Sequence, residues 1–231
     1  MDGVPRPLNE AERLAALRGY RILDTQPERA YDDVVAVASH LAGTPIALVS
    51  LVDADRQWFK ARHGLDAVET PRDLAFCAHT ILGDAPLVVE DARQDPRFRD
   101  TALVTGEPHI RFYAGVPLRN PEGHRLGSLC VIDREPRQLP DDVLRQLERL
   151  ARLVVDQMQL RLVSTELAEA LERARVLGEL IPVCAYCRRL RDDDQFWQSL
   201  ELYVERNTGS RLSHGICPDC LHEHFPAEEG D

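Results

Sequence analysis

Residues 110–133 read IRFYAGVPLRNPEGHRLGSLCVID and decide the fold of the first part of the chain. Two runs of this stretch, Ile110–Leu118 and Leu126–Asp133, have the length of strands and are largely apolar. Between them stands Asn120-Pro121-Glu122-Gly123, whose members favour a tight turn. The stretch therefore predicts an antiparallel hairpin.

The sequence before this hairpin predicts two helices, then strands, then a short helix. The first helix is expected over Leu8–Leu23, and the second follows Pro27 and stops at Gly43. The other expected elements are strands from Pro45 to Asp53, over Gln57–Arg62 and over Leu87–Glu90, and a short helix over Asp73–Leu82. This order predicts an α+β fold in which helices flank an antiparallel sheet.

From Pro140 the pattern becomes helical and stays so for about forty residues. An apolar side that ends near Met158 can pack on the sheet. Beyond it, apolar residues alternate at spacings of three and four, as in a coiled-coil seam: Leu160, Val163, Leu167, Ala170, Ala174, Leu177 and Ile181. A surface helix with one buried stripe would show a similar pattern. The length of the helix favours a parallel coiled coil that joins two subunits into a homodimer.

Four of the six cysteines stand at the C-terminal end as two Cys-x-x-Cys pairs: Cys184, Cys187, Cys217 and Cys220. Two such pairs at this spacing can supply a closed tetrahedral shell of four thiolates, for which zinc is the expected metal and iron the usual rival. A segment this small needs metal binding for its stability. His214, His222 and His224 flank the second pair and are alternative ligands for a site with three cysteines and one histidine.

Composition narrows the class of protein. The chain of 231 residues is 44% hydrophobic and 29% charged, with a formal net charge of −11. This negative charge argues against a general nucleic-acid binder. The sequence shows neither an apolar secretory signal nor a run long enough for a membrane helix. A cytoplasmic location is therefore expected, where the cysteines stay reduced.

Residues from about Leu8 to Leu162 resemble a GAF domain, the small-molecule sensing module of bacterial signalling proteins. The resemblance rests on several runs in order, namely 69–72 and 76–81, 89–92 and 95–98, 111–118 and 126–133. They look most like the bacterial GAF domains placed ahead of histidine kinases and diguanylate cyclases. The resemblance implies a ligand pocket on one face of the sheet, roofed by Arg62–Leu82 and Asp91–His109. The candidate ligand-binding residues are Phe76, His79, Phe98, His109, Arg111 and Tyr113.

Three residues of this region leave alternatives open. Arg111 in an apolar strand needs an anionic partner, which is either Asp91 inside the protein or an acidic group of the ligand. Cys77 and Cys130 are expected to be core residues. A bilin attached to Cys77 and a redox couple of Cys77 with Cys130 are the alternatives, because both occur in other GAF proteins.

These elements predict a chain of several parts. Residues 1–139 form the sensor domain, with the following helix packed on it to about residue 158. A connecting helix or coiled coil spans 140–181, a four-cysteine metal-binding module spans 182–226, and 227–231 form a tail. The metal-binding module resembles a tail found at the C-terminus of bacterial PAS, GAF and response-regulator proteins, which implies a place in signalling.

The predicted function is a non-catalytic intracellular sensor. The sequence contains no phosphate-binding glycine loop, nucleophile elbow or kinase ATP-binding motif. Output is therefore expected to pass through a partner protein, with an unknown small molecule in the pocket. One alternative is a redox switch in which the cysteine site releases zinc on oxidation. Another is a small-molecule enzyme that uses His79 and His109 as acid and base.

Overall fold

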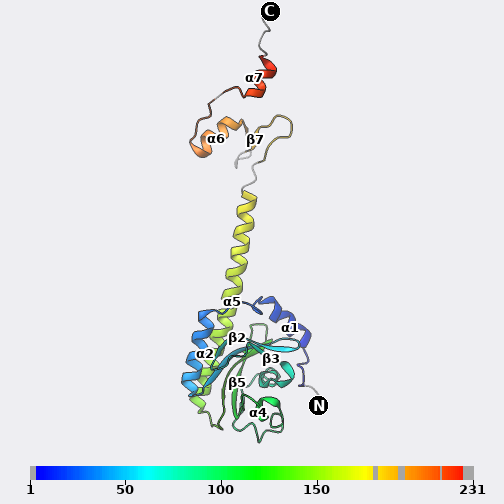
Figure 1. The fold of residues 1–231 in the computed structure, drawn as a ribbon, viewed down its shortest axis with the longest axis vertical. Coiled ribbons are helices and arrows are strands. Elements are labelled where there is room, and N and C mark those ends of the chain that lie inside the picture. Colours follow the sequence, from blue (N-terminus) through cyan, green and yellow to red (C-terminus); the bar gives the residue numbers. More distant parts are fainter. Residues whose placement is uncertain (1–3, 179–181, 192–195, 214, 226–231) are drawn as a thin grey trace, which may run out of the picture. The chain divides into compact units, whose positions relative to one another are not determined.

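The computed structural model describes residues 4–178, 182–191, 196–213 and 215–225. Contacts divide the chain into two compact units, residues 1–166 and 167–231. Each unit is considered by itself below (Figure 1). No described helix is long and apolar enough to cross a membrane.

The first unit is built on a six-stranded sheet in which all neighbouring strands are antiparallel. The strand order is β3-β2-β1-β6-β5-β4. The strands are β1 (Ile46–Val52), β2 (Arg56–His63), β3 (Glu69–Pro71), β4 (Leu87–Val89), β5 (Phe112–Arg119) and β6 (Arg125–Asp133). The hairpin expected from residues 110–133 is β5 and β6, and its register pairs Gly115 with Cys130.

Helices and loops cover both faces of this sheet (Figure 1). One face packs against α1 (Glu10–Gly19), α2 (Arg29–Ala42) and the first part of α5 (Asp141–Gly178). The other face packs against α3 (Phe76–Thr80) and α4 (Ala102–Thr105), with the 3-10 turn Arg72–Leu74 beside them. The prediction of an α+β fold with an antiparallel sheet between helices is confirmed.

Strand β1 shows why its sequence is continuously apolar. Ala47, Val49 and Leu51 belong to the core under the long helices, whereas Ile46 and Leu48 belong to the core on the opposite face. Successive side chains of a strand point to opposite faces, so a strand buried on both faces needs apolar residues throughout. The two cores meet at this strand, and the second of them contains the candidate site.

The observed helix ends agree with the sequence-based expectation for α2 but not for α1 and α3. Helix α2 ends as expected, with Gly43 in the left-handed conformation at φ 61°. The helix expected over Leu8–Leu23 is shorter in the structure, where α1 covers Glu10–Gly19. The helix expected over Asp73–Leu82 is split, since Ala75 is extended and separates the 3-10 turn from α3.

Helix α1 is tied to the sheet by a buried ion cluster. Glu10 accepts hydrogen bonds from Arg13 and from Arg72, and Arg72 also donates to the backbone carbonyls of Asp53 and Ala54. Burial alone would raise the pKa of the Glu10 carboxyl, but the hydrogen bonds from Arg13 and Arg72 outweigh it and lower the pKa from 4.5 to about 2. The carboxylate therefore stabilises the folded state.

We expect Glu10→Gln to destabilise the first unit at pH 7 by about 3 kcal/mol, because a fall of about two pKa units is worth that much. A group whose pKa is lowered on folding stabilises above its unfolded value and loses this contribution as the pH falls. The difference between Glu10→Gln and the unmodified chain should therefore shrink from about pH 4.5 towards pH 2. Urea unfolding at pH 7 and at pH 3 measures this difference in the free energy of unfolding. An equal difference at both pH values would contradict this account.

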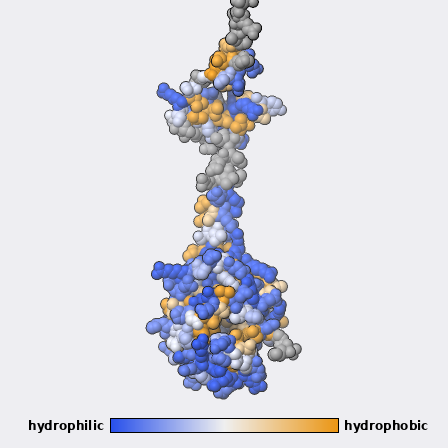
Figure 2. All heavy atoms as spheres, viewed as in Figure 1, coloured by the Kyte–Doolittle hydropathy of each residue, from blue (hydrophilic) through white to orange (hydrophobic). Residues whose placement is uncertain are grey.

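The second unit contains the rest of α5 and several short elements. These are β7 (Leu190–Arg191), β8 (Trp197–Gln198), α6 (Leu200–Thr208) and α7 (Pro218–His224). Apolar side chains appear at the surface of this unit in Figure 2, and large residues such as Phe196, Ile216 and Phe225 are exposed. Few of its described residues are buried, so this unit has little core of its own. The predicted tail over 227–231 lies outside the described residues.

Candidate functional site

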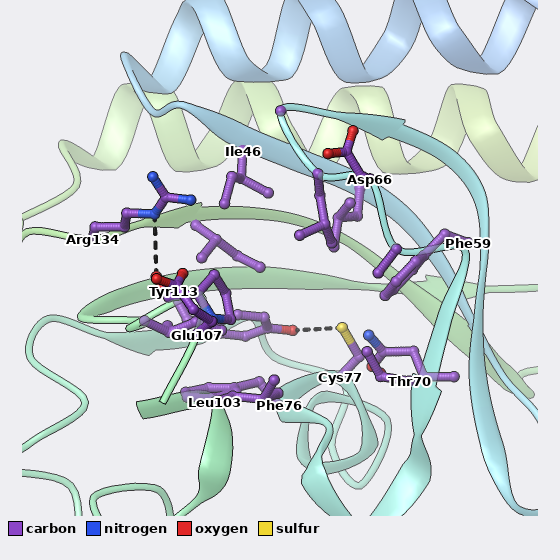
Figure 3. Close-up of a pocket in the computed structure, with 18 residues that line it drawn as sticks. Ile46, Phe59, Asp66, Thr70, Phe76, Cys77, Leu103, Glu107, Tyr113 and Arg134 are labelled. Carbon is purple, nitrogen blue, oxygen red and sulfur yellow. Dashed lines mark hydrogen bonds between the residues drawn. The ribbon is translucent and has the colours of Figure 1, made fainter. Parts of the chain in front are cut away.

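A cavity of about 380 Å³ lies on the sheet face covered by α3 and α4. Its floor is formed by β1, β2, β5 and β6, and its walls come from residues 64–70, the start of α3 and residues 103–110 (Figure 3). Apart from Ile110, these walls lie within the two roof segments expected from the family resemblance. Apolar side chains make up most of the lining, among them Ile46, Leu48, Phe59, Leu65, Phe76, Leu103, Ile110 and Ile132.

Two polar atoms of the lining are buried without a hydrogen-bond partner among the described residues. They are Oε1 of Gln57 and Oγ1 of Thr70. A buried polar atom without a partner costs free energy, so such atoms are uncommon unless water or a ligand satisfies them. Gln57 and Thr70 are paired across β2 and β3, and both line the same cavity. Together they provide hydrogen-bonding groups for a bound molecule.

The rim of the cavity carries charge. Asp66, Glu107 and Arg134 line it and are exposed, and the Arg134 guanidinium donates a hydrogen bond to the Pro108 carbonyl at 3.2 Å (Figure 3). An apolar interior with a few polar groups is typical of a small-molecule site. The cavity therefore suits a small molecule with an apolar body and polar groups at its periphery.

Four of the six predicted ligand-binding residues form one aromatic cluster. The Phe76 ring stacks on Phe98 with centroids 4.0 Å apart and lies 5.1 Å from the Tyr113 ring, and His79 meets Phe98 edge-on at 4.8 Å. Phe76 and Tyr113 line the cavity described above. His79 and Phe98 instead line a second depression of about 710 Å³. The cluster thus separates two hollows.

The second depression is larger but less suited to a specific ligand. Exposed residues such as Arg97, Asp100 and Thr105 form much of its lining. Burial, followed by the positive charge of Arg97, lowers the pKa of His79, so its neutral form is favoured. We take the smaller cavity as the candidate site, because half of its lining residues are buried, a larger share than in the second depression, and because it contains the two unpartnered polar atoms.

His109 and Arg111 lie at neither hollow. His109 is exposed, 3.8 Å from a carboxylate oxygen of Glu107. The Arg111 guanidinium donates to the backbone carbonyls of Val104 and Ile110. The expectation that Asp91 is its internal partner is wrong, because Asp91 forms a bidentate pair with Arg93. Backbone carbonyls satisfy Arg111 in place of an acid.

Sequence reasoning missed the polar residues of the cavity. Gln57, Thr70, Glu107 and Arg134 were not among the candidates, although all four line it. One signal was available for Gln57, since a polar side chain at the start of a strand that is otherwise buried is unusual. The other three come from loops or short edge segments, where no periodic pattern shows which residues face inward.

An ion network that joins a fully buried lysine to a partly exposed glutamate and arginine links the floor of the cavity to α5. On β2, Gln57 and Phe59 line the cavity, while the Lys60 side chain is fully buried and reaches towards α2. The Lys60 ammonium donates to Oε1 of Glu28 at 2.6 Å, and Arg161 of α5 donates to the same oxygen at 2.8 Å. A shift of β2 would therefore act on α5 through Glu28.

The cysteines of the second unit form two separate turns. The backbone amide of Cys187, followed by that of Tyr186, lowers the pKa of the Cys184 thiol. The Cys220 amide donates to the Cys217 sulfur at 3.5 Å and lowers the pKa of that thiol. Each turn thus favours a thiolate, as a metal ligand requires. Among the described residues, however, no three potential ligands are gathered into a metal site, so the two pairs are not brought together.

Comparison with known proteins identifies relatives of the first unit. The GAF domain family model matches residues 26–158. A cyclic di-GMP phosphodiesterase of Pseudomonas aeruginosa is 49% identical to this chain over 152 residues. That match covers 65% of this chain but only 26% of the phosphodiesterase.

Solved structures also resemble the chain at low sequence identity. The GAF domain of an Acinetobacter phosphoenolpyruvate-protein phosphotransferase is 17% identical, with a TM-score of 0.49 over 66% of this chain and 93% of that one. The blue-light absorbing form of the PixJ GAF domain from Thermosynechococcus elongatus is 16% identical, with a TM-score of 0.49 over 68% of this chain and 95% of that one. These likenesses carry no conclusion about function.

Proposed function

Because the chain belongs to the GAF domain family, we propose that it is a regulatory module that binds a small molecule in the sheet cavity and transmits this binding through α5. The observation that carries the proposal is the cavity itself. Its lining is mostly apolar, its floor is buried, and it contains two polar atoms, on Gln57 and Thr70, that lack partners among the described residues. A ligand that satisfies both atoms would bind more tightly than one that leaves them unpaired.

The ligand class follows from this lining. An apolar or aromatic body fits against Phe59, Phe76 and Ile132. A hydrogen-bond donor on the ligand would pair with Oε1 of Gln57. The exposed charges of Glu107 and Arg134 suit polar substituents at the opening.

We propose that the module itself is not an enzyme. His79 and His109, the candidate acid and base, do not share a cavity, since His79 lines the second depression and His109 is exposed. The phosphodiesterase relative does not alter this proposal, because the match spans 26% of its length. Output would then pass through a partner signalling protein. An enzymatic role of the cavity is the alternative.

The proposed route for transmission runs through Lys60 of β2 and its ion pair with Glu28. A ligand bound against Gln57 and Phe59 would displace β2, and Lys60 on the same strand contacts Glu28, which also holds Arg161 of α5. The Lys60 ammonium is fully buried, so leaving it without Glu28 would be costly, whereas Glu28 and Arg161 are partly exposed. This network gives a physical connection between the cavity and the helix.

Thr70→Val is expected to weaken ligand binding without destabilising the protein. It removes a hydroxyl that has no partner among the described residues, so the free energy of unfolding should change by less than about 0.5 kcal/mol while the dissociation constant rises about fivefold. Native mass spectrometry of the purified chain detects the retained small molecule, and urea unfolding measures stability.

Thr80→Val is the matched control. Its hydroxyl is buried and lies 2.7 Å from the Tyr113 hydroxyl, and Thr80 does not line the cavity. The same substitution there should cost about 1 kcal/mol of stability and leave ligand occupancy unchanged. The proposal is contradicted if neither variant alters ligand retention, or if Thr80→Val alone reduces it.

We further propose that two copies of the chain form a parallel dimer along α5. Leu160, Val163 and Leu167 of the expected seam are exposed, as is Leu153 one heptad before Leu160. Exposed apolar residues at heptad spacing are typical of a seam that a partner helix covers in a coiled coil. The side chains of Ala174, Leu177 and Ile181 lie outside the described residues. The exposed positions of Leu160, Val163 and Leu167 therefore support the first half of the proposed seam.

The second unit is proposed to hold one zinc ion through Cys184, Cys187, Cys217 and Cys220. Support comes from the paired spacing and from the amides aimed at Cys184 and Cys217. The exposed apolar side chains of this unit are also expected of a small module whose core forms only when metal joins its halves. His214 lies outside the described residues, as does the side chain of His222. The thiolates would be kept reduced in the cytoplasm, and a redox switch at this site is the alternative function.

A further inference from the structure

Two buried cysteines meet beneath the cavity. Cys77 lies in α3 and Cys130 in the central strand β6, and their sulfurs are 3.7 Å apart. The exposed fractions of the two residues are 1% and 0%. They are 53 positions apart in the sequence, so the fold alone brings them together. Both are core residues as expected, but their contact adds a chemical possibility.

The two thiols have different surroundings. Cys77 lines the cavity, whereas Cys130 is not among the residues described as lining it. The Tyr113 hydroxyl donates a hydrogen bond to the Cys77 sulfur at 3.3 Å (Figure 3). A molecule inside the cavity can therefore reach Cys77 directly, and Cys130 lies behind it at contact distance.

Hydrogen bonding reinforces this asymmetry. Burial alone would raise the pKa of Cys77, but hydrogen bonds from Cys130, Ser128 and Tyr113 outweigh it and lower the pKa. The contact with Cys77 and then burial raise the pKa of Cys130. Cys77 is thus the thiol that more readily becomes the nucleophilic thiolate.

We propose that Cys77 and Cys130 form a disulfide when Cys77 reacts with an organic hydroperoxide that enters the cavity. This chemistry goes beyond ligand sensing, because it requires an accessible cavity but no resident signalling ligand. The apolar lining, which includes Leu48, Phe59 and Ile132, favours a hydroperoxide with an apolar body over hydrogen peroxide.

The reaction has two steps. The Cys77 sulfur attacks the terminal oxygen of the hydroperoxide, the O–O bond breaks, and the alkoxide takes the thiol proton to leave as an alcohol. Cys77 is then a sulfenic acid. The Cys130 sulfur attacks Cys77, the S–S bond forms, and the hydroxyl group leaves as water with the Cys130 proton. Two thiols lose two electrons, and one hydroperoxide gains them.

Disulfide formation would change the floor of the cavity. The sulfurs must approach from 3.7 Å to about 2 Å, which draws α3 towards β6. Phe76 precedes Cys77 in α3 and lines the cavity, so its ring would shift as well.

The test uses the full-length chain, reduced and zinc-loaded. It is exposed to cumene hydroperoxide, quenched with an alkylating agent in denaturant, digested and mapped by mass spectrometry. We expect a peptide pair linked through Cys77 and Cys130. In Cys130→Ser, Cys77 should accumulate as a sulfenic acid that dimedone traps. In Cys77→Ser, Cys130 should remain a free thiol.

The rates identify the role of the cavity. Cumene hydroperoxide should react with Cys77 about tenfold faster than hydrogen peroxide, since burial of even a small apolar group is worth about 1.4 kcal/mol. Equal rates would overturn the assignment of the cavity as the hydroperoxide site. The proposed disulfide is refuted if Cys77 and Cys130 both stay alkylatable while the C-terminal cysteines oxidise, or if the linked peptide forms only in denaturant. Disulfide mapping of the unmodified chain by mass spectrometry shows whether Cys77 and Cys130 become linked, even where a variant fails to fold.

Discussion

Removal of zinc from the full-length chain is expected to abolish the fold of the second unit and to leave the first unit folded. Large apolar residues such as Tyr186, Ile216 and Phe225 are exposed there, so packing contributes little to its stability. Structural zinc supplies an apparent binding free energy of about 10–16 kcal/mol to small domains of this kind. Chelation should therefore remove the helical signal of α6 and α7, which circular dichroism measures.

Cysteine variants connect this effect to the proposed ligands. Cys184→Ser combined with Cys217→Ser removes one thiolate from each turn and should reduce zinc, measured by elemental analysis, from one ion per chain to a trace. Cys77→Ala with Cys130→Ala is the control and should leave zinc content unchanged, because both residues lie in the first unit. Full occupancy in the first pair of variants, or a chain that contains neither zinc nor iron, would contradict the metal site.

Leu167→Glu is expected to convert a dimer into monomers. Leu167 is 58% exposed in the single chain and occupies a central position of the proposed seam. In a parallel coiled coil the two introduced carboxylates would face each other in the interface, where burial and like charge both oppose association. Because each buried leucine contributes about 2 kcal/mol, we expect the dissociation constant to rise at least about a hundredfold.

The control for this variant is Ala168→Glu. Residue 168 follows Leu167 on α5, is exposed and lies outside the seam, so the same charge should leave dimerisation intact. Sedimentation velocity at tens of micromolar distinguishes the two species. An unmodified chain that sediments as a monomer would refute the dimer and reduce the later part of α5 to a connecting helix.

The hairpin of β5 and β6 could be predicted from sequence because its signals are local. Apolar strand-forming runs and the turn Asn120–Gly123 together specify strand, turn and strand within 24 residues. The end of α2 at Gly43 was predictable for the same reason. The roof segments expected from the family resemblance supply walls of the cavity.

The chemistry of the cavity could not be predicted in the same way. The contact of Cys77 with Cys130 joins residues from distant elements, and no sequence period records it. Arg111 looked as if it required an acid, yet the carbonyls of Val104 and Ile110 satisfy it, and side chains alone do not reveal backbone partners. Thr70 lies on the short edge strand β3, and its unpartnered oxygen depends on its register with β2.

Hydrogen–deuterium exchange tests most directly the claim that a small molecule binds in the sheet cavity. Protein loaded from a metabolite extract is compared with protein stripped of small molecules by unfolding and refolding. Ligand in the cavity should slow amide exchange in residues 64–70 and 107–110, which form its walls. Slowed exchange confined to residues 95–102, which border the second depression, or no change in either segment, would contradict this account.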